Sequence, residues 1–278
     1  MIPDSESEPQ PPLTLGFVFV LALLAPLTQF LWMLLFEKIA VQLGPSSLGM
    51  ATLVTYGGMF ALCAARFRVP PARQLAFVPA PLTGWLAVIF LAAAVIVSSE
   101  LDNVVKAIAP PPVVPPAELG PMPPLAGVAL AFLQIGVFPL CYGVFFRGVL
   151  QPLASARLGA LGAVLVTAFL SAFADAFIPS LISRGLWLLA PALLNALVLC
   201  ILRQCSRSLW PALALESLWG VVQICAAYQV FGLAGFDAGG GHTPLVWVGS
   251  GALLTVVGLA LCRAAAREGS ARSTPAQS

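Results

Sequence analysis

The stretch that decides the fold is Pro139-Leu-Cys-Tyr-Gly-Val-Phe-Phe-Arg-Gly-Val-Leu-Gln151, an apolar segment that carries an arginine at position 147. It ends an apolar run that begins near residue 125 and is long enough to cross a bilayer as a helix. A charge inside a membrane helix costs about 2.5–3.5 kcal/mol on insertion scales. Arg147 therefore needs either a partner or a function.

Composition identifies the solvent around the rest of the chain. Hydrophobic residues make up 60% of the 278 residues, charged residues make up 9%, and the mean hydropathy is +0.98. A soluble domain of this size cannot cover its surface with so few charges, so we expect a lipid bilayer to surround most of the protein. The net charge of +2 and the scattered basic residues give no reason to expect a nucleic-acid partner.

Eight apolar runs predict eight transmembrane helices, because lipid offers backbone groups no other hydrogen-bond partner. They span about 13–36, 46–65, 82–99, 125–150, 159–178, 186–202, 209–231 and 244–262. The sequence thus predicts an all-α polytopic membrane protein with one domain over 13–262 and disordered tails at 1–12 and 263–278. The acidic, proline-rich start lacks the basic region of a signal peptide, so the first run is expected to remain a span.

The distribution of basic residues predicts the orientation. If the N-terminus is cytoplasmic, the segments on the inner side hold Arg66, Arg68, Arg73, Arg147, Arg157, Arg203, Arg207, Arg263, Arg267 and Arg272. The outer segments then hold only Lys38, Lys106 and Arg184. This bias predicts that both termini are cytoplasmic. The alanine, proline and arginine content suggests a bacterial cytoplasmic membrane.

Two loops and the cysteines suggest no chemistry. Ile108 to Pro124 is proline-rich and predicts a stiff outer spacer. Phe236 to Thr243 predicts a flexible outer turn with the only histidine, His242, to which we assign no role. The six cysteines form no Cys-x-x-Cys pair, so we expect no metal and no cofactor.

Ionisable residues inside the spans are rare and are the first candidates for a site. Arg147 and Glu216 both lie toward the inner side of their spans, where an ion pair is geometrically reasonable. Structural pairing and a binding role stay equally open for these two residues. Asp175 lies near the outer end of its span, where we expect it to reach the headgroups or cap a helix. Helical spacing puts Glu216, Gly220 and Gln223 on one face.

Three segments resemble motifs of the CAAX-protease and bacteriocin-processing (CPBP) family, also called abortive-infection proteins. Phe145-Phe-Arg-Gly-Val-Leu-Gln-Pro-Leu153 is similar to the arginine-containing first motif, and Val166 to Phe177 is similar to the second motif helix. Leu202 to Gly220 resembles the turn and helix of the third motif, with Ser208-Leu-Trp-Pro-Ala212 as its most specific part. The resemblance covers about 125–232 and implies an eight-helix intramembrane protease fold.

The catalytic positions of that family are replaced here. The family's paired glutamates correspond to Tyr142 and Gly143, and its Phe-x-x-x-His corresponds to Phe173 and Phe177. Its His-x-x-x-Asn or Asp corresponds to Glu216 and Gly220, so only Arg147 and Phe173 are kept. The family mechanism implies a glutamate base with histidine or asparagine donors at the oxyanion, and the tyrosine, glycine and phenylalanines at these positions supply neither a base nor a metal ligand. No catalytic residue is therefore assigned, and the binding candidates are Arg147, Glu216, Gln223 and Tyr142.

Three functions follow from this comparison. The first is a catalytically inactive homologue that binds a membrane peptide, a lipidated peptide or a membrane-protein partner. The second is an active endopeptidase with a rebuilt site, in which Glu216 acts as the base, Arg147 positions the substrate, and Tyr142 or Gln223 donates to an oxyanion. The third is a small-solute or proton-coupled transporter using Asp175, Glu216 and Arg147, which the lack of internal repeats disfavours.

Overall fold

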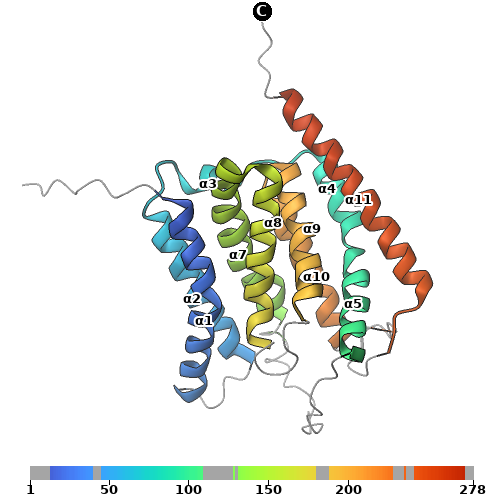
Figure 1. Cartoon of the computed structure of the whole chain (residues 1–278), viewed down its shortest axis with the longest axis horizontal. Coiled ribbons are helices and arrows are strands. Elements are labelled where there is room, and N and C mark those ends of the chain that lie inside the picture. Colours follow the sequence, from blue (N-terminus) through green and yellow to red (C-terminus); the bar gives the residue numbers. More distant parts are fainter. Residues whose placement is uncertain are drawn as a thin grey trace, which may run out of the picture.

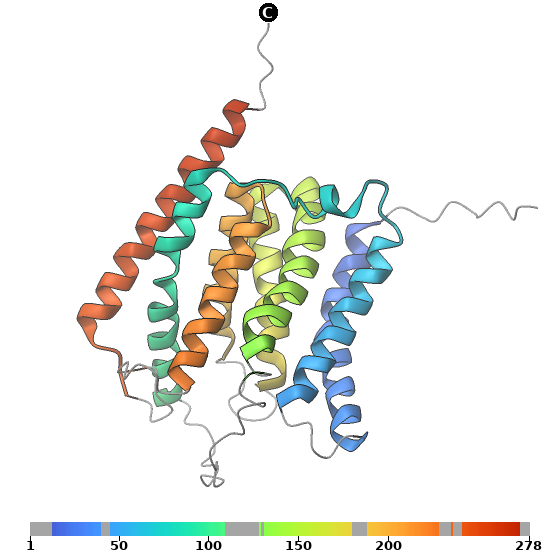
Figure 2. The same ribbon diagram turned by 180° about the vertical axis from the view of Figure 1, so that it is seen from behind.

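The computed structural model describes residues 13–39, 45–108, 128, 131–179, 188–227, 235 and 241–272. No strand occurs among them, which confirms the prediction of an all-α protein. The helices stand side by side as a bundle, and the start of α1 and the end of α11 lie at the same end (Figures 1 and 2). The predicted disorder at residues 1–12 and 273–278 and the predicted stiff spacer at 109–124 concern residues outside the described part of the chain.

Figure 1 labels the helices in chain order. Their bounds are α1 Leu15–Ile39, α2 Pro45–Ala64, α3 Pro71–Gln74, α4 Leu82–Leu91, α5 Ala94–Ile108, η1 Leu133–Val137, α7 Phe138–Tyr142, η2 Gly143–Leu150, α8 Gln151–Pro179, α9 Leu189–Ser206, α10 Trp210–Ala227 and α11 Leu245–Arg272.

The described helices account for the predicted spans. Five segments are long and apolar enough to cross a membrane: Leu15–Phe36, Leu82–Ile108, Ile135–Phe177, Leu189–Ser206 and Leu245–Glu268. Two shorter apolar helices, Leu48–Ala64 and Trp210–Ala226, match the second and seventh predicted spans. The 43-residue segment contains Gly159, whose φ of 73° interrupts the helix and divides it into the fourth and fifth spans. The molecule is thus a polytopic integral membrane protein.

Three predicted boundaries are wrong. The third span does not end at residue 99 but continues through α5 to Ile108. The fourth span continues through residues 151–158, which the sequence suggested were a loop, and turns only at Gly159. Arg147 therefore lies about three helical turns before the end of its span instead of near it. The helix α11 runs to Arg272, beyond the predicted end of the membrane domain at residue 262.

Four apolar clusters form the core of the part of the chain that the structure describes, and two of them are large. One joins α1, α2, η2 and α8 through buried side chains such as Val18, Tyr56, Phe146 and Leu170. The other joins α4, α5, α9, α10 and α11 and includes Leu91, Leu199, Leu215 and Trp219. The phenylalanines 169, 173 and 177 form a stripe along α8, with the rings of the first pair stacked at 6.5 Å and those of the second pair tilted at 5.4 Å between centroids.

The last helix closes one edge of the bundle. Figures 1 and 2 show α11 tilted along α4 and α5, and it also contacts α9. Gly251 and Gly258 allow this close approach. A Cβ atom at Gly258 would lie 2.7 Å from the Leu91 Cγ atom, and one at Gly251 would lie 3.2 Å from the Ala93 carbonyl oxygen.

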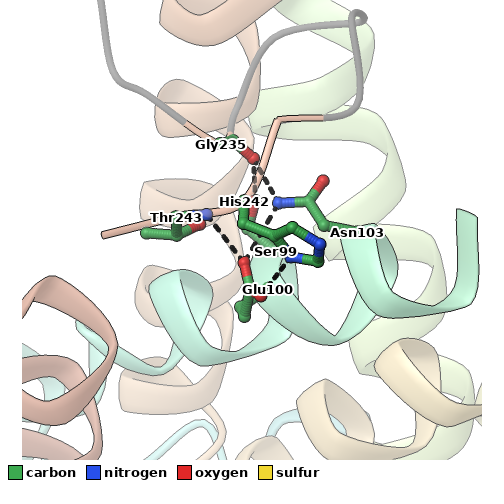
Figure 3. Close-up of polar contacts among 6 residues, drawn as sticks. All are labelled: Ser99, Glu100, Asn103, Gly235, His242 and Thr243. Atoms are coloured by element: carbon green, nitrogen blue, oxygen red, sulfur yellow. Dashed lines mark hydrogen bonds and ion pairs between the residues drawn. The ribbon is translucent and has the colours of Figure 1, made fainter. Parts of the chain in front are cut away.

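A polar cluster ties the segment before α11 to α5 (Figure 3). Glu100 accepts a hydrogen bond from the Thr243 amide at 2.7 Å, and its other oxygen lies 2.7 Å from His242 Nδ1. Asn103 Nδ2 donates to the Gly235 carbonyl at 2.7 Å. The His242 side chain is 62% exposed and has a carboxylate partner in Glu100.

Candidate functional site

A cavity of about 280 Å³ lies within the helix bundle. Side chains from α1, α2, α7, η2, α8, α9 and α10 line it. Its polar lining residues are Gln29, Tyr142, Arg147, Ser171, Asp175, Asn195, Glu216 and Gln223.

Arg147 is held in the wall of this cavity by a wide helical turn. It lies within η2, a π-helix of eight residues, and such turns are frequent at functional sites. The following residue, Gly148, has room for no side chain, since a Cβ atom there would lie 2.9 Å from Leu75 Cδ2 and 3.4 Å from Leu209 Cδ2. The Arg-Gly pair of the motif thus combines a buried charge with a close helix contact.

Glu216 is the ion-pair partner of Arg147, as the sequence predicted. It comes from α10, whose first turn is capped by the preceding motif. The Ser208 hydroxyl accepts a hydrogen bond from the Trp210 amide at 3.3 Å and donates to the Val78 carbonyl at 2.6 Å. The Ser-Leu-Trp-Pro run therefore fixes where α10 begins and brings Glu216 to Arg147.

The two partners of the ion pair differ in exposure. The Arg147 side chain is 2% exposed, whereas the Glu216 side chain is 22% exposed and faces the cavity. The Nε atom of Arg147 is buried and has no hydrogen-bond partner in the described part of the chain. The guanidinium of this lining residue thus keeps one buried donor without a partner among the described residues.

Asp175 lies in the cavity wall and does not cap a helix or project to the membrane surface as expected. It shares this wall with Ser171, one turn earlier on α8. Its side chain is exposed, and no hydrogen bond or ion pair joins it to any residue that the structure describes. The cavity therefore contains two carboxylates and one guanidinium.

The predicted face of α10 is also present. Glu216, Gly220 and Gln223 all line the cavity, together with Trp219, which the prediction did not include. The indole of Trp219 donates to the Ala92 carbonyl at 3.2 Å, at the break between α4 and α5.

Tyr142 lines the cavity, and a chain of hydrogen bonds holds its hydroxyl group in place. Its hydroxyl donates to Gln29 Oε1 at 3.3 Å, and Gln29 Nε2 donates to the Thr52 hydroxyl at 2.7 Å. The sequence analysis missed Gln29 and Asn195, because a search for charges passes over neutral amides. A search for every amide within a span would have found both.

The remaining family positions do not line the cavity. Phe173 and Phe177 belong to the aromatic stripe of α8, and Phe177 packs near Met33 and Ala51. A Cβ atom at Gly143 would lie 3.6 Å from Arg147 Nη2 but would collide with the Leu213 side chain. One of the two positions where the family carries a glutamate is thus packed against the Leu213 side chain of α10.

The fold and the cavity define a polytopic helical membrane protein with a polar site buried within its bundle. Residues 124–222 match the family described as type II CAAX prenyl endopeptidase Rce1-like. This match confirms the resemblance to the CPBP family over these residues, and the molecule is an integral membrane protein that is similar to CPBP intramembrane proteases. Neither the curated proteins nor the solved structures gave a significant match.

Proposed function

We propose that this protein is a catalytically inactive CPBP homologue that uses its cavity to bind a membrane peptide, a lipidated peptide or a membrane-protein partner without cutting it. We place it in a bacterial cytoplasmic membrane with both termini inside, on the strength of its charge bias and composition. No nucleic acid takes part in this proposal.

The occupied position beside Arg147 carries the proposal. The family's paired glutamates correspond here to Tyr142, which has no carboxylate, and to Gly143, where a Cβ atom would meet the end of the Leu213 side chain. The guanidinium that would act beside that base is already paired with Glu216. Nucleophilic water needs a base within about 2.6–3.2 Å, and no family base remains in this place.

The test is hydrolysis by the full chain purified in detergent. Quenched-fluorescent peptides, including prenylated C-terminal peptides, are incubated with the wild type and with Glu216→Gln and Arg147→Ala. We expect no turnover above that of a heat-denatured sample. Turnover by the wild type that disappears in Glu216→Gln would overturn the proposal.

One observation favours an enzyme with a rebuilt site as the second candidate. Asp175 faces the same cavity as Glu216, so a second acid–base group is available, which the sequence analysis did not expect. In this alternative one carboxylate acts as general base and the other as general acid. The same assay with Asp175→Asn distinguishes it, because both carboxylate variants would then lose turnover.

A further inference from the structure

The cavity is lined by two carboxyl groups and one guanidinium. Arg147 and Glu216 form an ion pair with each other. Asp175 lines the cavity and has no ion-pair partner among the described residues. Because an uncompensated carboxylate inside a membrane is costly, a positive group in the cavity would stabilise it.

Two buried polar atoms without hydrogen-bond partners in the described part of the chain also bear on the kind of ligand that fits. The side-chain oxygen of Asn195, another lining residue, is buried and accepts no hydrogen bond from the described residues. The unpartnered donor is the buried Nε of Arg147. A ligand that satisfies this wall donates hydrogen bonds to Asp175 and Asn195 and offers an acceptor to Arg147.

Aromatic side chains complete the lining. Phe138, Tyr142 and Trp219 all contribute to the cavity wall. Aromatic faces attract cations within about 6 Å, and more strongly where the cation is desolvated. A volume of about 280 Å³ lies at the lower end of the range for small-molecule sites, which suits one side chain rather than a whole prenylated peptide.

We propose that the group received by this cavity is a primary ammonium, presented by a lysine side chain of the bound membrane peptide. Asp175 and Asn195 accept its hydrogen bonds, the aromatic residues surround its methylene stem, and a peptide carbonyl accepts from Arg147. The peptide part of this inference rests on the proposed binding function. The ammonium part also applies to a free amine.

The first test uses small probes and the full chain in detergent. Thermal unfolding is followed with n-butylammonium, 1-butanol and butyrate at equal concentrations, since a ligand of the folded state raises the midpoint. We expect only n-butylammonium to raise it in the wild type. Equal shifts with 1-butanol, or no shift with the amine, would overturn the ammonium site without any variant.

Two variants assign the effect to the cavity. Asp175→Asn keeps the shape of the side chain and should abolish the shift with n-butylammonium. The matched control is Asp102→Asn, which removes a carboxylate from α5 outside the cavity lining and should keep the shift. A full shift in Asp175→Asn contradicts the proposal.

The second test separates the ammonium site from the proposed function. Fluorescent single-span peptides with a central lysine or leucine are reconstituted with the protein in nanodiscs, and both binding and peptide mass are measured. We expect at least about tenfold tighter binding of the lysine peptide, a difference of about 1.4 kcal/mol, and intact peptides. If the peptides are cleaved but the lysine peptide still binds more tightly, the proposed lack of catalysis is refuted and the ammonium site is not. If both peptides stay intact and bind equally, the lysine preference is refuted and the proposed lack of catalysis is not.

Discussion

The ion pair between Arg147 and Glu216 makes a quantitative prediction about stability. Replacing Glu216 by leucine leaves a guanidinium that is 2% exposed without its partner, and such a loss costs about 3–5 kcal/mol. Replacing Arg147 by methionine keeps the buried stem. The remaining Glu216 is 22% exposed to the cavity, where it can be hydrated, so we expect a smaller loss of about 1–3 kcal/mol.

The double variant Arg147→Met/Glu216→Leu measures the coupling between the two side chains. Because it leaves neither charge unpaired, it should lose less stability than the sum of the single changes. We expect a coupling free energy of about 2 kcal/mol, within the range for residues in contact. The assay is reversible unfolding in mixed micelles of dodecylmaltoside and SDS, followed by circular dichroism.

Additive effects in this cycle would refute the reasoning. If the double variant equals the sum of the single variants to within about 0.5 kcal/mol, the two residues are not coupled. The charge-swapped variant Arg147→Glu/Glu216→Arg serves as a second check. It should recover part of the stability lost in the single changes.

Two glycines yield further predictions from the same unfolding assay. Gly258→Ala places a Cβ atom 2.7 Å from Leu91 Cγ and should lower the stability by about 1–3 kcal/mol through overpacking. The control Gly249→Ala, whose Cβ atom meets nothing within 4 Å, should lower it little. Equal effects of the two changes would contradict the close packing of α11. Gly235→Ala strains a residue with φ of 88° and brings a Cβ atom 2.6 Å from the Thr243 amide nitrogen. It should therefore lower the stability by about 1–3 kcal/mol and increase hydrogen exchange at the Thr243 amide. Unchanged exchange would contradict the attachment of this segment to α5.

Much of the fold was predictable because the membrane makes hydropathy a direct signal. Each apolar run had to become a helix, and a buried arginine had to find a partner, which Glu216 supplies. The boundary between the fourth and fifth spans was not predictable in this way. The predicted spans left residues 151–158 between them, but the helix continues to Gly159, whose φ of 73° interrupts it.

The candidate site was predictable only in part. The spacing of Glu216, Gly220 and Gln223 placed them correctly on one face, because helical periodicity is local. Whether Asp175 faces lipid, headgroups or the interior depends on how α8 is rotated within the bundle, which tertiary packing decides. The same holds for the filling of position 143 by Leu213, a contact between helices that no local pattern encodes.

The packing of α11 on α4 has a consequence for biogenesis. During translation, α4 and α5 enter the membrane long before α11 is synthesised, so the Leu91 surface stays uncovered until α11 packs on it. The last helix to leave the ribosome is thus the one that completes the second apolar cluster, and assembly of this cluster is coupled to the end of translation. A chain interrupted before Leu245 would leave the Leu91 surface open to lipid and available to membrane quality-control factors.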